Sequence, residues 1–174
     1  MDMTISQAIR KVKDLKGKMA KHQSYAATSV LYAVKEPPAY AFKSELETIE
    51  TLGKELLKLQ TAIAVANATT SVDWNGQKVR LAWCVRRLEE IKGKIAWYEG
   101  LSVYAQSESS VDSWDYHDVG DKMERVKTEK KMKCDLPQAE RDKITASLQD
   151  EFNKLNDVVE TTNHRTSVGE AHET

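Results

Sequence analysis

The sequence is poor in the residues on which disulfide-rich domains, metal sites and membrane spans depend. Its 174 residues include two cysteines, Cys84 and Cys134, whose spacing fits no zinc or redox motif. Cys84 falls on an apolar helical stripe, so we expect a buried and unreactive thiol there. No apolar run approaches the ~18 residues of a membrane span, and the first four residues do not begin a signal peptide. A cytoplasmic protein with reduced thiols, without metal or cofactor, is therefore expected.

The sequence also lacks an excess of either charge. Lysine and arginine number 26 against 27 aspartates and glutamates, which gives a net charge of −1. Such a balance offers no electrostatic attraction to nucleic acid or to an anionic membrane. No glycine-rich phosphate loop, His-Glu-x-x-His, nucleophile elbow or Cys-x-x-Cys is present, so no enzyme signature is visible.

What the sequence does contain is a repeat. The phrase Asn67-Ala68-Thr69-Thr70-Ser71-Val72 returns as Asn163-His164-Arg165-Thr166-Ser167-Val168, and residues 9–20 return as residues 85–96. Repeats of this kind indicate a duplicated structural unit. The sequence predicts one helical hairpin written twice, over residues 4–72 and 80–168.

Apolar residues at helical spacing predict four amphipathic helices, over residues 4–22, 40–66, 78–99 and 137–162. Thr4 with Gln7 forms a candidate capping box at the first. The expected buried stripe of the second is Phe42, Leu46, Ile49, Leu52, Leu56, Leu59, Ile63 and Ala66. Short connections favour antiparallel neighbours, so we expect a mainly α, up-down-up-down antiparallel four-helix bundle. It forms a single domain over residues 1–168, followed by a flexible tail at residues 169–174.

The segments between the helices carry further expectations. Residues 29–34 and 102–105 are rich in β-branched and aromatic residues, which predicts two short β-like arms at one end of the bundle. Each is a short strand or an extended arm, and the two could pair as strands within one chain or between chains. Residues 67–76 read as a compact turn, and residues 117–132 as a short helix. Glycines inside the helices, at positions 17, 53 and 93, predict that another backbone comes close. Two tryptophans off the stripes, Trp83 and Trp97, indicate a second packing surface.

The topology places both copies of the repeated phrase at one end of the bundle. This end is the candidate ligand site, made of Arg10, Asn67, Thr70, Arg86, Asn163 and Thr166. Two interpretations stay open. The arginine forks and the amides could hold a carboxylate or phosphate, or the asparagines cap helix C-termini in the left-handed conformation while the threonines satisfy backbone groups.

A second polar cluster holds five residues, Asp112, Asp115, His117, Asp118 and Asp121. Hard divalent cations take such oxygen ligands. The segment lacks the glycine and glutamate positions of an EF-hand loop, however, and acidic residues are common at helix starts. We expect no metal site here, and we expect His22 and His172 to be solvated.

Several motifs carry a resemblance to a known family. They are the early helix with Arg10, Glu36-Pro37-Pro38 before a leucine-rich helix, Ile63-x-x-x-Asn67-x-x-Thr70 with Gly76, Arg86 or Arg87 before Leu88, and Asn163. With these the chain resembles an uncharacterised family of small helical bacterial and phage proteins, some labelled septicolysin. The family's last motif reads Asn-Trp, where this chain has His164. The resemblance implies an oligomeric helical fold and no established activity.

The function that we expect is therefore that of a non-enzymatic helical bundle. It self-associates into a homo-oligomer and acts through protein–protein contacts in a phage or mobile-element setting, hence in the host cytoplasm if phage-encoded. The alternative is a protein that binds and sequesters a small ligand, a nucleotide or another anion, at the repeated Asn/Arg end. A metal-dependent enzyme centred on Asp115 and His117 is the third possibility.

Overall fold

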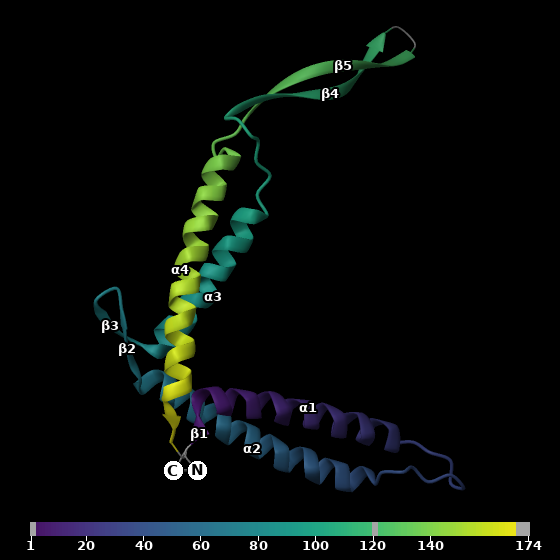
Figure 1. Cartoon of the computed structure of the whole chain (residues 1–174). Coiled ribbons are helices and arrows are strands. Elements are labelled where there is room, and N and C mark those ends of the chain that lie inside the picture. The colour runs from purple at the N-terminus through teal and green to yellow at the C-terminus, as the bar shows by residue number, and fades with distance from the viewer. Residues whose placement is uncertain (1–2, 120–121, 170–174) are drawn as a thin grey trace. The chain divides into compact units, whose positions relative to one another are not determined.

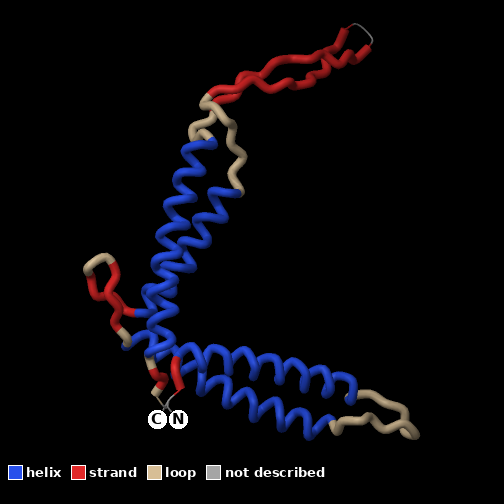
Figure 2. Tube along the Cα trace, viewed as in Figure 1, coloured by secondary structure: helices blue, strands red, loops and turns tan. Residues whose placement is uncertain are grey.

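The structure, a computed structural model, describes residues 3–119 and 122–169. It is mainly helical, with four helices and a few strands (Figures 1 and 2). The helices are α1 (Ile5–Ser29), α2 (Phe42–Thr69), α3 (Leu81–Glu99) and α4 (Gln138–Arg165). The prediction of a mainly α protein with four helices is confirmed. Their arrangement as one up-down-up-down bundle stays a prediction.

Strands form three separate two-stranded antiparallel sheets (Figure 2). In the first sheet, β1 (Met3–Thr4) pairs with β6 (Ser167–Val168). The second joins β2 (Ser71–Trp74) to β3 (Gln77–Arg80). The third is a long ribbon of β4 (Glu108–Val119) and β5 (Lys122–Lys133).

The chain divides into two compact units. The first unit comprises Met1–Arg87 and Leu155–Thr174, and the second comprises Leu88–Lys154. In the first unit α1 and α2 lie side by side as a helical hairpin, and β6 lies against both of them (Figure 1).

The hairpin of the first unit packs along one apolar stripe of α1, whose residues follow one another at steps of three and four. Ile5, Ala8 and Leu15 are buried, and the same three- and four-residue steps continue to Ala26 and Ser29, which are buried as well. Thr4 and Gln7 form the predicted capping box, because the Gln7 amide donates to Thr4 Oγ1 and the Thr4 amide donates to Gln7 Oε1. The helix runs seven residues past its predicted end at residue 22.

The predicted stripe of α2 is wrong at its N-terminal end. Phe42 and Leu46 are exposed, whereas Glu45 is buried beside α1 together with Ala62 and Ala66. The reason is a polar partner on α1, described below, which stabilises a carboxylate on the packed face. Hydrophobicity alone therefore selected the wrong face for the first turns of the helix.

The second unit contains most of α3, the ribbon and the first part of α4. Apolar residues at helical spacing face its interior, since Ile91 is fully buried and Ile144 and Leu148 are partly buried. The Lys92 ammonium of α3 lies 5.9 Å from the centroid of the Phe152 ring of α4. Backbone hydrogen bonds from Gln138 to Tyr104 (2.9 Å) and from Cys134 to Ser107 (2.7 Å) tie the ribbon base to α4.

The two β-like arms are not strands, so that prediction is wrong. Residues 30–41 and 100–107 form loops, and the strands lie instead at residues 108–133, where a helix over 117–132 was expected. The ribbon is stabilised across its strands, by an ion pair from Lys127 to Asp112 (2.7 Å) and by Arg125 over the Trp114 ring at 4.4 Å. Such cross-strand pairs are not visible in a helical periodicity.

The turn predicted at residues 67–76 is in fact the end of α2 followed by the β2–β3 hairpin. Asn75 and Gly76 form its two-residue loop, with φ of 50° and 78°. Positive φ at both positions is what a type I′ turn requires, and Asn-Gly is its preferred sequence.

The glycines inside the helices do not mark close helix crossings. A Cβ at Gly17, Gly53 or Gly93 would have no described atom within 4 Å. That prediction is wrong, and Gly53 is taken up again below.

No described helix is both long enough and apolar enough to cross a membrane. All but the first residue of the predicted tail, including His172, lie outside the described part of the chain.

Candidate functional site

The two copies of the repeated phrase meet the starts of two helices within the first unit. We call this region the repeat junction: it consists of residues 67–72 and 163–168 together with residues 3–5 and 79–81. Four of the six predicted ligand residues, Asn67, Thr70, Asn163 and Thr166, belong to it. Each phrase lies beside the start of a helix, since Leu81 of α3 bonds to Thr70 and Ile5 of α1 bonds to Thr166.

The junction is built twice with the same hydrogen bonds. The Thr70 amide donates to the Ala66 carbonyl, and the Thr166 amide donates to the Thr162 carbonyl, both at 2.9 Å. The threonine carbonyls then accept from the first amide of the next helix: Leu81 donates to Thr70, and Ile5 donates to Thr166, again both at 2.9 Å. Each threonine thus satisfies one of the amides that a helix start leaves without an internal partner.

The strand pairing repeats as well. Ser71 and Val72 pair with Arg80 and Val79, as Ser167 and Val168 pair with Thr4 and Met3. Both valines of the phrase are buried, at 8% and 7% exposure. The structure therefore accounts for the second half of the phrase. The threonine lies where the helix ends and the strand begins, the serine pairs with the neighbouring strand, and the valine is buried.

The copies differ at the residue before each helix. Thr4 caps α1, whereas the equivalent Arg80 cannot accept a hydrogen bond through its side chain. Its guanidinium donates instead to the Thr69 carbonyl (2.6 Å) and to Ser71 Oγ (2.8 Å). A cation at the C-terminus of α2 interacts favourably with the negative end of the helix dipole. Sequence reasoning did not identify Arg80.

The asparagines lie inside their helices rather than at left-handed caps. Asn67 precedes the last residue of α2 by two positions and Asn163 does the same in α4, and Asn75 is the one described non-glycine residue with positive φ. The capping interpretation of the asparagines is therefore wrong. The residue that ends α2, Thr70, has an extended backbone with φ −73° and ψ 129°.

The side-chain oxygens of the two asparagines share a further property. Oδ1 of Asn67 and Oδ1 of Asn163 are buried and accept no hydrogen bond from any described group. A buried acceptor without a partner costs about 1–3 kcal/mol. The equivalent positions carry the same cost, and the chemistry that relieves it is a hydrogen-bond donor, not an anion.

The two predicted arginines lie at exposed helix positions outside residues 67–72 and 163–168. Arg10 and Arg86 occupy equivalent positions, five residues after the buried Ile5 and Leu81 that begin their helices, and both are exposed. A depression of about 350 Å³ lies on the β4–β5 ribbon and another on the first turns of α4, and neither is lined by any of the six predicted residues. The structure brings the asparagines and threonines into one junction and leaves the arginines on the helix surfaces.

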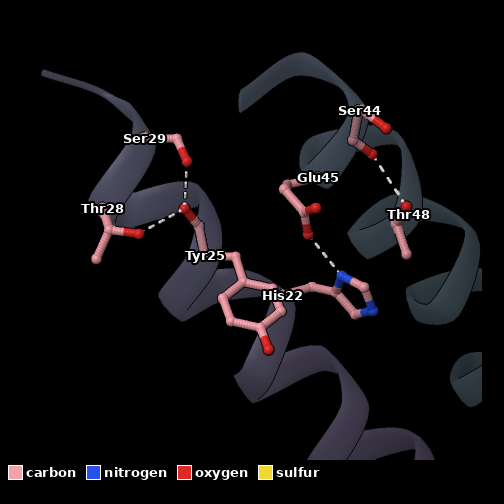
Figure 3. A network of polar contacts seen from close by, with 7 residues as sticks. All are labelled: His22, Tyr25, Thr28, Ser29, Ser44, Glu45 and Thr48. Carbon is pink, nitrogen blue, oxygen red and sulfur yellow. Dashed lines mark hydrogen bonds and ion pairs between the residues drawn. The ribbon is translucent and has the colours of Figure 1, made fainter. Parts of the chain in front are cut away.

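A polar cluster that sequence reasoning missed lies near the far end of the α1–α2 hairpin (Figure 3). His22 Nδ1 of α1 donates to Oε2 of Glu45 of α2 at 2.5 Å. The Glu45 side chain is 11% exposed and that of His22 is 29% exposed. The expectation that His22 is solvated is therefore wrong.

Aromatic and hydroxyl groups surround this pair. The rings of Tyr25 and Tyr40 stack with centroids 4.0 Å apart, and the Lys21 ammonium lies 5.5 Å from the Tyr25 ring. Hydrogen bonding between the tyrosines lowers the pKa of Tyr25 and raises that of Tyr40. Ser29 Oγ donates to the Tyr25 carbonyl at 2.7 Å (Figure 3). The cluster joins the end of α1 to the start of α2.

The position of His22 could have been found from the sequence. The α1 stripe of Ile5, Ala8, Val12, Leu15 and Met19 steps to His22, Ala26 and Ser29 when the same spacing is extended. A histidine on a buried stripe is expected to form a hydrogen bond with a polar residue of the neighbouring helix. The sequence could not have shown that this partner is Glu45 and not one of the exposed glutamates.

The predicted acidic cluster is described only in part. Asp112 pairs with Lys127. The side chains of Asp115, His117 and Asp118 and the whole of Asp121 lie outside what the structure describes. Among the described residues no group of three or more candidate ligands could hold a metal ion.

The prediction that Cys84 is buried is confirmed. The side chain is fully buried, and burial raises the pKa of its thiol. Cys134 is also buried, and its Sγ donates to the Leu136 carbonyl at 3.1 Å.

Comparisons with known proteins give no match: no family model, no curated protein and no solved structure is similar to this chain.

Proposed function

We propose that the protein is a non-enzymatic helical protein that self-associates and acts through protein–protein contacts. The observation that carries the proposal is the number of large apolar side chains left exposed on well-formed helices. Leu57 and Val65 of α2 are 67% and 55% exposed, and Trp83 and Trp97 of α3 are 45% and 60% exposed. Aromatic side chains of this kind are enriched where proteins contact one another.

The proposal includes the finer arrangement expected from the sequence. The duplicated hairpins form an up-down-up-down four-helix bundle, the protein works in the cytoplasm in a phage or mobile-element setting, and the family is the one that the sequence motifs resemble. Large apolar residues are exposed on the helices, in the loop after α1 and on the ribbon, and this distribution over open surfaces favours proteins over small molecules as partners.

Native mass spectrometry and multi-angle light scattering of the full chain test the proposal. We expect a defined multiple of the 19.7 kDa chain that dissociates on dilution. A chain that stays monomeric from low to high micromolar concentration, with helical circular dichroism intact, would contradict self-association.

A second candidate function, the binding of a small ligand, is favoured by the buried oxygens of Asn67 and Asn163. A nucleotide carries amino donors that suit such acceptors and phosphates that suit Arg10 and Arg86. The test is the mass spectrum of gently purified protein, compared between wild type and an Arg10→Ala/Arg86→Ala variant. A ligand mass present in the wild type and lost from the folded variant supports binding, and its absence from both opposes it.

A further inference from the structure

α2 has two faces, and among the described residues of the first unit only one of them packs against other elements, chiefly α1. The face toward α1 carries Glu45, Ala62 and Ala66, which are buried, and Glu55, whose side chain forms an ion pair with Lys11 at 2.5 Å. At about 100° per residue, the opposite side of the helix carries a second apolar stripe. This free face consists of Phe42, Leu46, Gly53, Leu57 and Ala64.

The apolar side chains of the free face are open to solvent. Phe42 is 38% exposed, Leu46 41% and Leu57 67%. They lie on one side of α2 over more than four turns, with Gly53 between Leu46 and Leu57. An unpartnered stripe of this length is typical of a helix that packs against another helix.

Gly53 lies at the middle of this stripe. Glycine inside a helix costs about 0.5–1 kcal/mol relative to alanine. No described atom lies within 4 Å of the position that its Cβ would occupy, so packing within the chain does not account for it. A glycine at the centre of an apolar face lets the backbone of another helix approach closely.

Charged residues along one edge of the free face indicate that the other helix is a second copy of α2 in the antiparallel orientation. Glu47 and Glu50 precede Gly53, while Lys54 and Lys58 follow it, and all four are exposed. In an antiparallel pair related by a twofold axis near Gly53, the acidic half of one helix faces the basic half of the other. Glu47 then lies opposite Lys58, and Glu50 lies near Lys54. In a parallel pair this charged edge would face the opposite edge of the partner helix, which carries Ile49 and Leu56, so the four charges would find no opposite charge there.

We propose that the free face of α2 binds the same face of a second copy of the chain, antiparallel, about a twofold axis near Gly53. Such a contact is isologous, because each copy contributes the same residues. This inference rests on the proposed self-association and assigns it a surface.

Two apolar variants of the full chain test the surface by sedimentation equilibrium. Gly53→Leu blocks the close approach, and Leu57→Glu places a charge on the stripe. Each should weaken dimerisation about tenfold or more. Gly17→Leu is the matched control, since Gly17 is an exposed glycine in the middle of α1 with no described atom within 4 Å of its Cβ position. It should leave the dissociation constant unchanged.

Charge reversal tests the antiparallel orientation and avoids changes to the apolar stripe. Glu47→Lys and Lys58→Glu should each weaken the dimer several-fold, and the double variant should restore most of the loss. A double variant weaker than both single variants would refute the orientation.

The outcomes separate this surface from the broader function. A monomeric wild type overturns both. An oligomeric wild type whose dissociation constant is the same in Gly53→Leu and Leu57→Glu overturns this surface and leaves self-association standing.

Discussion

Replacing His22 by alanine should destabilise the protein through Glu45. The carboxylate of Glu45 is 11% exposed and accepts its hydrogen bond from His22 at 2.5 Å. A charged hydrogen bond contributes about 1.5–3 kcal/mol, and breaking a fully buried ion pair costs about 3–5 kcal/mol. Because the His22 side chain is 29% exposed, water can reach the site, so we expect a loss of about 2–3 kcal/mol.

The assay is thermal and urea unfolding followed by circular dichroism. For a chain of this size the loss corresponds to a fall in Tm of roughly 4–12 °C. Lys154→Ala is the control, because it removes an exposed ion pair with Asp150 whose side chains are 67% and 65% exposed; it should cost at most about 0.5 kcal/mol.

A double variant separates the buried carboxylate from lost packing. His22→Ala with Glu45→Leu removes the unpaired charge, so it should be more stable than His22→Ala alone. If His22→Ala costs no more than the Lys154→Ala control, or if the double variant recovers nothing, the pair does not stabilise the hairpin in the way described.

Three further predictions concern the turn, the thiol and the repeat. Gly76→Ala should lower the free energy of unfolding by about 1 kcal/mol because φ is positive there, whereas Gly93→Ala should raise it by about 0.5–1 kcal/mol. Urea unfolding measures both changes and shows whether they have opposite signs. Burial raises the pKa of Cys84, so its thiol stays protonated in the folded state as the pH rises past the ordinary thiol pKa. Labelling of this thiol at mildly alkaline pH should therefore be as slow as unfolding. Fast labelling of Cys84 in the native protein would contradict its burial. Ile5→Ala and Leu81→Ala, at equivalent positions with 0% exposure, should each cost about 2–5 kcal/mol, and a large inequality in unfolding free energy would show that the copies pack differently.

Some features of the fold were predictable because their causes lie within a few residues. The Thr4–Gln7 capping box and the stripe that begins at Ile5 follow from local hydrogen bonding and from 3.6-residue periodicity. The Asn75-Gly76 hairpin also has a local cause, and its signal was present in the sequence although the segment was interpreted as a simple turn.

The candidate site was predictable in part. The repeated phrase correctly indicated that Thr70 and Thr166 have equivalent positions, because sequence identity at a fixed offset requires no knowledge of contacts. The roles of their carbonyls toward Leu81 and Ile5 depend on which helix start lies beside which helix end. That adjacency is a property of the chain's path through space.

The sequence by itself determined the four long helices, the repeated phrase, the buried stripe of α1 and the burial of Cys84, since each depends on local periodicity or on similarity between the two copies. The tertiary structure alone decided which face of α2 is buried, that His22 meets Glu45, and that Glu108–Val119 pairs with Lys122–Lys133 as a ribbon. These outcomes depend on contacts between residues far apart in the sequence. The energy of a buried polar pair or of a cross-strand pair exists only once both partners are in place, so hydrophobic periodicity carries no trace of it.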